Sequence, residues 1–320
     1  MRQSSPSPSI QVVKLRQLQC LCAVAEADFN VSRAAVALHA TQPAVSKQLR
    51  QLEEELGLDL LQRYGGRVIG LTDAGERTLV FGRRALQCVE SIRGLTQESR
   101  GDSGGSIVLA TSHTHAKYVL LPVIRAFTRR YPKVRILVRH GGPEQASDMV
   151  REGKATVGVI SIAPRDRNDV LAVPFRSYRL VLIAPPGHPV LKVKTLTLER
   201  LSGYPFVLIH PSPLGVHVLE KFKRVDLDVD VAVEAVNADM AKDFVGAGLG
   251  IALIPSFAYS PRTDRNLRGR DAGHLFDPVT SSILLRRESH LPRYVYDFLE
   301  TVDATLERRR LDSLIFSQDP

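Results

Sequence analysis

The stretch "TQPAVSKQLRQLEEELG" (residues 41–57) decides how the first part of the chain folds. Four apolar residues recur in it at spacings of four, three and four: Val45, Leu49, Leu52 and Leu56. This period places them on one face of a helix, which we expect to enter a core. Pro43 fits near the start of that helix, where a missing N–H costs nothing, and Thr41 precedes it as a cap. The stretch therefore predicts one amphipathic helix.

A second face of this helix carries hydrogen-bond donors. Gln42, Ser46 and Arg50 stack at four-residue intervals, with Lys47 beside them. Upstream, residues 15–27 and a shorter segment capped by Asn30 also have helical periodicity. Two short helices joined by a tight turn, the second with a donor-rich face, are typical of a helix-turn-helix. A solvated face in any three-helix bundle gives the same pattern, so periodicity alone leaves both interpretations open.

The next segment, "LDLLQRYGGRVIGLTDAG" (residues 58–75), predicts a β-hairpin wing with a Gly-Gly turn. Arg63 and Arg67 flank the turn, where they suit phosphates or a narrow minor groove, or are simply surface charges. Asp73 and Glu76 then resemble the capping box of a helix of about 25 residues. Its apolar stripe has coiled-coil spacing and predicts dimerisation: Phe81, Ala85, Cys88, Ile92 and Leu95.

Beyond a Gly/Ser-rich linker, the chain alternates strand-like and helix-like segments. This alternation predicts largely parallel α/β sheets in two Rossmann-like lobes around a cleft. We expect helices at residues 122–130, 215–224 and 238–247, and a return to the first lobe through "SSILLRR" and a final helix over 292–308.

The segment "TSHTH" (residues 111–115) follows the first strand of this region, at the mouth of the predicted cleft. Backbone N–H groups at a helix start, with the Ser112 and Thr114 hydroxyls, suit an anion. A metal site needs a third ligand, and beyond His113 and His115 the obvious one is His210, on the far lobe. Catalysis by Ser112 with His113 lacks a nucleophile-elbow motif. The anion pocket is the favoured interpretation; a hydroxyl-rich turn without a ligand is the alternative.

Composition permits a nucleic-acid partner without requiring one. The net charge is +9, yet residues 15–72 hold six Lys/Arg and six Asp/Glu, so the helix-turn-helix segment is neutral. No apolar run reaches the roughly 20 residues of a membrane span, and the Ser/Pro-rich start lacks a signal-peptide core. The three cysteines, Cys20, Cys22 and Cys88, have no metal-binding spacing. These features predict a cytoplasmic protein.

The segment "NVSRAAVALHATQPAVSKQLRQLEEELGLDLLQRYGGRVIGLTDAG" (residues 30–75) resembles the DNA-binding domain of LysR-type transcriptional regulators. The resemblance implies promoter DNA as partner, self-association as a dimer or tetramer, and RNA polymerase as a candidate partner. It implies DNA contacts by the following residues: Thr41, Gln42, Pro43, Ser46, Lys47, Arg50, Arg63 and Arg67. Position 47 is commonly Arg in the family, and Lys replaces a bidentate donor with a point charge.

"GAGLGIALIP" (residues 246–255) resembles the LysR effector domain, a pair of lobes like a type 2 periplasmic binding protein. "ATSHTHAKYVLLPVIRAFTRRYP" (residues 110–132) resembles the CysB branch, which regulates sulfur assimilation. That branch implies an effector such as sulfate, thiosulfate or O-acetylserine. The implied pocket consists of Ser112, Thr114, His115, Ser161, His210 and Ser212. His115 replaces a typical Gln, and "LIHPSPLG" lacks the usual threonines, so a carboxylate or amino-acid effector is the alternative.

The expected organisation has four parts: a disordered leader (1–14), a winged helix-turn-helix (15–72), a linker and dimerisation helix (73–100) and an effector domain (101–320). Lobe I is expected over about 106–174 and 275–320, and lobe II over about 175–274. No enzymatic activity, resident cofactor or metal is expected. A secreted solute-binding protein is the rival from another class, and it would need export.

Overall fold

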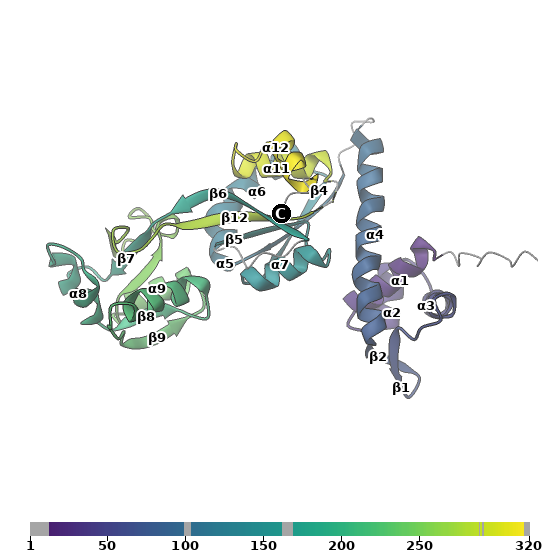
Figure 1. The fold of residues 1–320 in the computed structure, drawn as a ribbon, viewed down its shortest axis with the longest axis horizontal. Helices are drawn as coiled ribbons and strands as arrows, with labels where there is room; N and C mark the ends of the chain where they lie inside the picture. Colours follow the sequence, from purple (N-terminus) through teal and green to yellow (C-terminus); the bar gives the residue numbers. More distant parts are fainter. Residues whose placement is uncertain (1–12, 99–103, 162–168, 288, 290, 317–320) are drawn as a thin grey trace, which may run out of the picture. The chain divides into compact units, whose positions relative to one another are not determined.

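The computed structural model describes residues 13–98, 104–161, 169–287, 289 and 291–316. The chain forms two compact units, one from α1 to α4 and the other from β3 to α12 (Figure 1). The predicted leader falls largely on residues 1–12, which lie outside the described residues. The elements of the first unit are α1 (Leu15–Glu26), α2 (Val31–Ala37), α3 (Gln42–Leu56), β1 (Leu61–Tyr64), β2 (Arg67–Leu71) and α4 (Asp73–Glu98).

The first unit has its core between α1, α2 and α3. Leu49 and Leu52 of α3 are buried there with Leu21 of α1. Leu56, predicted for the core, is instead 36% exposed because α3 ends there and Gly57 turns the chain in the left-handed region at φ 64°. The Asn30 side chain accepts a hydrogen bond from the Arg33 N–H at 3.0 Å and begins α2, as predicted.

The wing and the start of α4 form one connected structure. β1 and β2 pair antiparallel, and Gly65 and Gly66 both take positive φ in the turn, which glycine adopts at little cost. The Thr72 hydroxyl accepts a bond from the Gly75 N–H at 3.0 Å and donates to the Asp59 carbonyl at 2.6 Å. The cap of α4 is therefore Thr72, and the predicted capping box one residue later is wrong.

The second unit consists of two lobes. Lobe I contains β3 (Gly105–Thr111), α5 (His113–His115), η1 (Ala116–Leu120), α6 (Leu121–Arg130), β4 (Val134–His140), α7 (Pro143–Arg151), β5 (Val157–Ser161), β6 (Val170–Tyr178), β12 (Val279–Arg286), α11 (Arg293–Val302) and α12 (Arg308–Phe316). Lobe II contains β7 (Leu180–Ala184), η2 (Pro189–Lys192), α8 (Leu198–Ser202), β8 (Phe206–Ile209), α9 (Pro213–Lys223), β9 (Val231–Ala235), α10 (Ala238–Gly246), β10 (Ala252–Pro255), η3 (Ser256–Ala258) and β11 (Arg268–Asp271).

The sheet of lobe I has the order β4-β3-β5-β12-β6 and is covered on both faces. Alternate residues enter separate cores: Leu109 packs with residues of α6 and α11, whereas Ala110 packs against α7. Figure 1 shows α11 and α7 on opposite sides of this sheet. The central strand β5 is thus buried on both sides, as parallel strands in α/β sheets are, whereas the edge strand β4 is largely exposed. β3, β4 and β5 run parallel, and β12 pairs antiparallel with both β5 and β6.

Lobe II is less parallel than the sequence predicts. β8 and β9 are parallel, but β7 pairs antiparallel with β10 and β11. β6 leads into lobe II and β12 leads back, so two neighbouring strands of one sheet carry both connections. The single helix predicted over 292–308 is also wrong: α11 ends at Val302, and Asp303 accepts a bond from the Thr305 N–H at 3.0 Å in a turn before α12.

Gly75 is expected to tolerate no side chain. A Cβ there would lie 2.0 Å from the Leu60 carbonyl oxygen, so Gly75→Ala should lower the free energy of unfolding by roughly 1–3 kcal/mol. Gly82 is the matched control on the same helix, because its Cβ would meet Leu18 at an ordinary 3.4 Å. Gly82→Ala should leave stability unchanged or raise it by up to about 1 kcal/mol. Urea unfolding followed by circular dichroism measures both, and equal stabilities would contradict this packing.

Candidate functional site

A groove of about 870 Å³ lies between α3, the segment before α2 and the wing. Its walls carry five of the eight predicted DNA-contacting residues: Gln42, Ser46, Arg50, Arg63 and Arg67. Thr41, Pro43 and Lys47 are exposed on the first two turns of α3 or just before it. Asn30 and Ser32, which were not predicted to contact DNA, form part of the wall as well. Their position around the start of α2 is the sequence feature that could have indicated this role.

The donors in the groove are held in different ways. The Gln42 amide donates to the Ser46 hydroxyl at 3.1 Å, while Arg50 and Arg67 are exposed. Arg63 forms an ion pair with Glu53 of α3 at 2.5 Å. Arg63 therefore ties the wing to α3, in addition to facing the groove.

Glu53 links the helix to the wing by several bonds to one carboxylate. It accepts the N–H groups of Leu60 and Leu61 at 2.9 and 3.1 Å as well as the Arg63 guanidinium. Partial burial acts to raise the pKa of Glu53, but these hydrogen bonds and the Arg63 charge outweigh it and hold the pKa below its usual range. The carboxylate thus stays ionised and fixes the wing beside the recognition face.

The predicted dimerisation stripe on α4 faces solvent. Phe81 is 66% and Ile92 62% exposed, Cys88 is exposed and Ala85 is half-buried. Leu95 lies in the last turns of α4, where the described structure is limited to the backbone. A helix face with two large exposed apolar side chains is a surface that a partner can cover.

A second group of polar side chains gathers in lobe I. We call it the hydroxyl cluster; it consists of Ser112, His115, Ser161, Tyr178 and Ser281. The His115 ring is at its centre, with Nδ1 3.0 Å from the Ser112 hydroxyl. Its Nε2 lies 3.1 Å from the Ser281 hydroxyl and 3.2 Å from that of Ser161. Ser161 also bonds the Tyr178 hydroxyl at 2.6 Å.

The sheet explains why these residues meet. β3 and β5 are parallel neighbours with Thr111 opposite Val159, so their carboxyl ends bring Ser112 and Ser161 to one edge. β12 runs antiparallel beside β5 and places Ser281 opposite Ser161. The helix after β3 begins at His113, nine residues before the predicted start, and passes through a π-helical turn at Ala116–Leu120. Such turns are frequent at functional sites.

His115 is neutral in this setting. The residue is 4% exposed, and burial lowers the pKa of its imidazole to about 4. A neutral imidazole donates from one ring nitrogen and accepts at the other, and both nitrogens face hydroxyl groups. The cluster therefore presents dipoles rather than a fixed positive charge.

The other predicted effector residues lie elsewhere or have other partners. Thr114 is half-buried beside the cluster in sequence. His210 Nδ1 is 3.4 Å from Glu234, and the Ser212 hydroxyl accepts the Gly215 N–H at 3.0 Å as the cap of α9. His210 and Ser212 thus bond to residues of lobe II, and their role in binding an effector stays a prediction. Over the described ranges, no three His, Cys, Asp or Glu side chains converge as a metal site.

A winged helix-turn-helix joined by a long helix to a two-lobed α/β unit defines a ligand-responsive DNA-binding regulator as the class of this protein. Residues 15–76 match the family described as "Bacterial regulatory helix-turn-helix protein, lysR family", and residues 100–307 match "LysR substrate binding domain". The chain belongs to the LysR family and is a transcriptional regulator rather than an enzyme.

Three individual proteins show how similar this chain is to known regulators, and two of them, CysB and Cbl, are sulfur-related. The HTH-type transcriptional regulator CysB of Burkholderia cenocepacia is 32% identical over 304 residues, 95% of this chain and 97% of that protein. The solved cofactor-binding domain of the Cbl transcriptional regulator has a TM-score of 0.63 at 29% identity, covering 68% of this chain and 96% of that one. Full-length CbnR, solved in complex with its target DNA, has a TM-score of 0.60 at 25% identity, with 91% and 99% covered. No described helix has the length and apolar character to cross a membrane.

Burial of His115 gives stability a defined pH dependence. The unfolded chain titrates this ring near pH 6.5 and the folded chain near 4, so between those values the unfolded state binds the extra proton. Stability should therefore fall as the pH falls from 6.5 to 4, by about 3 kcal/mol from this residue. His115→Gln should flatten urea-unfolding stability over that range, whereas His140→Gln, an exposed residue of the same lobe, should not. Parallel pH profiles for all three proteins would contradict a buried neutral His115.

Proposed function

We propose that this regulator controls sulfur-assimilation genes in the cytoplasm by binding promoter DNA in response to a small sulfur-linked anion or an acetylserine-type effector. The observation that carries the proposal is the hydroxyl cluster at the carboxyl ends of β3 and β5, on a chain similar to CysB over 95% of its length. The DNA-binding part rests separately on the groove between α3 and the wing.

The groove suits a DNA backbone that is contacted between the major groove, where α3 would bind, and the minor groove, where the wing would bind. α3 would enter the major groove with Gln42, Pro43 and Ser46, and the Gln42 amide and the Ser46 hydroxyl match base edges and phosphates. Arg67 would reach the minor groove from the wing, and Arg50 the backbone between them. Lys47 would add a point charge. The neutral net charge of residues 15–72 does not oppose this, because the cations are at the face and Glu53 is engaged by Arg63.

Self-association would follow from α4. Pairing of two copies through the exposed face of Phe81, Cys88 and Ile92 would remove large apolar side chains from water. Two copies then present two recognition helices, which suits DNA half-sites with dyad symmetry. A tetramer, formed as a dimer of dimers, and contact with RNA polymerase at the promoter complete the proposal.

The chemistry of the cluster favours an acceptor-rich ligand. Sulfate at neutral pH carries no proton, so it needs donors, and serine, threonine and tyrosine hydroxyls with the N–H groups at a helix start supply them without a cation. Ser112, Thr114, His115 and Ser161 would form the lobe I side of the pocket, with His210 and Ser212 facing them from lobe II. A carboxylate or amino-acid effector is the second candidate, because His115 differs from the glutamine usual in the CysB branch.

Removing groove cations should weaken DNA binding and its dependence on salt. Arg50→Ala and Arg67→Ala are each expected to reduce the slope of log affinity against log salt by about 1, because each removes one cation from the DNA interface, at the backbone for Arg50 and in the minor groove for Arg67. Arg77→Ala is the control, since Arg77 is exposed on α4 and does not line the groove. Fluorescence anisotropy with a promoter duplex over a range of salt concentrations measures the slopes. An unchanged slope in Arg50→Ala would refute the assignment of the groove.

The effector proposal is tested by calorimetric titration of the full chain with sulfate, thiosulfate and O-acetylserine. We expect saturable binding of at least one ligand, weakened about tenfold in Thr114→Ala or Ser161→Ala by loss of a hydrogen bond to a charged or polar group. Ser177→Ala is the control, because that hydroxyl bonds Thr280 on the exposed surface of lobe I. Binding of glutamate but none of the three would favour the carboxylate alternative.

A further inference from the structure

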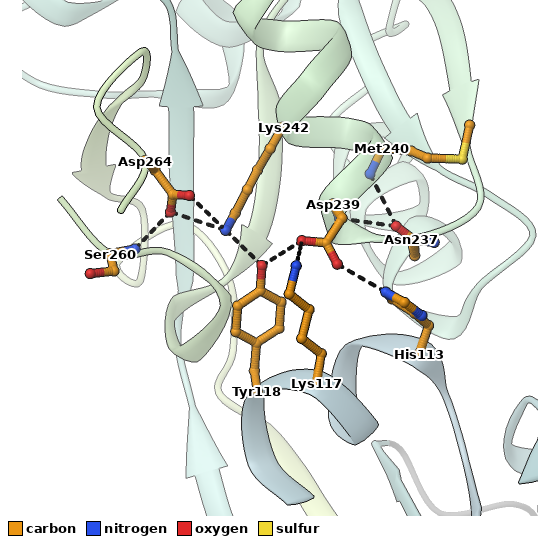
Figure 2. Close-up of polar contacts among 9 residues, drawn as sticks. All are labelled: His113, Lys117, Tyr118, Asn237, Asp239, Met240, Lys242, Ser260 and Asp264. Atoms are coloured by element: carbon orange, nitrogen blue, oxygen red, sulfur yellow. Dashed lines mark hydrogen bonds and ion pairs between the residues drawn. The ribbon is translucent and has the colours of Figure 1, made fainter. Parts of the chain in front are cut away.

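A group of charged and polar side chains joins the two lobes of the second unit (Figure 2). We call it the interlobe cluster. Asp239, in the first turn of α10 in lobe II, is its central residue, and three donors from lobe I converge on its carboxylate. Oδ1 accepts from Lys117 and from the Tyr118 hydroxyl, each at 2.6 Å, and Oδ2 lies 2.9 Å from His113 Nε2. The full cluster consists of His113, Lys117, Tyr118, Asp239, Lys242 and Asp264.

Asp239 is not needed to begin α10. The Asn237 side chain already caps that helix by accepting the N–H groups of Asp239 and Met240, each at 3.0 Å. The Asp239 side chain is 24% exposed. Its partial burial acts to raise its pKa, but the hydrogen bonds from Lys117, Tyr118 and His113 outweigh this and hold the pKa below its usual range. The ionised carboxylate is therefore directed at lobe I.

Tyr118 extends the contact to a second point on α10. Its hydroxyl donates to Asp239 and accepts from Lys242 Nζ at 2.8 Å, and the Lys242 ammonium lies 4.7 Å from the centre of the Tyr118 ring. Lys242 also forms an ion pair with Asp264 at 3.0 Å and is nearly buried. Burial and the neighbouring carboxylates raise the pKa of Tyr118, so the phenol keeps its proton and remains a donor to Asp239.

The lobe I donors of the interlobe cluster lie on the same short helical segment as two residues of the hydroxyl cluster. Ser112 and His115 bond within the hydroxyl cluster, whereas His113, Lys117 and Tyr118 bond to lobe II. The segment 112–118 thus has one face at each cluster. Because one short helical segment carries both sets of bonds, we expect a shift of this segment at one cluster to alter the hydrogen bonds at the other.

The geometry points to Asp239 as a positioning residue of the effector site: from the opposite lobe it holds the turn that carries Ser112, Thr114 and His115, and it couples occupancy of the hydroxyl cluster to the contact between the lobes. Its link to an effector rests on the proposed function; the contact itself does not. Charge-assisted hydrogen bonds of this kind are about twice as strong as neutral ones. Removal of the acceptor also leaves Lys117 and Tyr118 without a carboxylate partner.

Hydrogen–deuterium exchange of the full chain tests the contact directly. In Asp239→Ala we expect amides of both 113–120 and 238–246 to exchange about tenfold faster, because each segment loses its partner across the lobes. Asp243→Ala is the matched control: it removes an exposed acidic residue from the same helix, beyond its first turn. The control should change both segments less than twofold. Faster exchange confined to 238–246 would overturn the proposal, because Asp239 would then act only within α10.

A double-mutant cycle separates a shared interaction from two independent ones. Tyr118→Phe removes the hydroxyl that joins Asp239 to Lys242 and keeps the ring. If Asp239 and Tyr118 act together, the double variant Asp239→Ala/Tyr118→Phe should accelerate exchange by clearly less than the product of the two single-variant effects. Multiplicative effects would overturn the coupling.

Titration of the same proteins with sulfate and O-acetylserine tests the link to the effector. Asp239→Ala should lower the affinity for whichever ligand binds the wild type by about tenfold, and Asp243→Ala should leave that affinity unchanged. An unchanged affinity in Asp239→Ala, despite faster exchange in both segments, would overturn its role in positioning the effector site. Absence of binding in the wild type would contradict the effector assignment in the proposed function, while the exchange data would still decide whether Asp239 joins the lobes.

Discussion

The ligand-responsive half of the protein depends on the parallel pairing of β3 with β5. That pairing brings Ser112 and Ser161 to one edge of the sheet, and β12 adds Ser281 opposite Ser161. The chain then turns into a helix whose first residues have partners in both lobes. His115 bonds Ser281 in lobe I, and Tyr118 bonds Asp239 in lobe II. One strand-to-helix junction therefore determines both the shape of the proposed pocket and the contact between the lobes.

In the DNA-binding half, the positions of the charged residues matter more than their net charge. The chain has a net charge of +9, but residues 15–72 are neutral. Arg50 and Arg67 face the groove, while Glu53 is occupied by Arg63 and by two backbone N–H groups of the wing. Long-range attraction would come from the rest of the molecule, and the groove itself would supply orientation.

Local patterns predicted much of this structure. Helical periodicity gave α1 to α4, and the Gly65–Gly66 pair gave the wing. The end of the first α/β strand indicated Ser112 and His115, and the family resemblance added Ser161. Tyr178 and Ser281 were missed because they join the cluster through antiparallel pairing of distant strands. Asp239 was missed for the same reason: its partners are more than 120 residues away, and no local spacing marks it. At the break, the Asp303 carboxylate accepts bonds from the Thr305 N–H and hydroxyl, which periodicity does not detect.

We propose that occupancy of the hydroxyl cluster changes how the winged helix-turn-helix engages DNA. Hydroxyl-radical footprinting of the full chain on the upstream region of a sulfur-assimilation operon, with and without sulfate or O-acetylserine, tests it most directly. We expect an effector to alter the length or spacing of the protected segments for the wild type and not for Thr114→Ala. Identical footprints under all conditions, at concentrations that saturate a ligand in calorimetry, would contradict it.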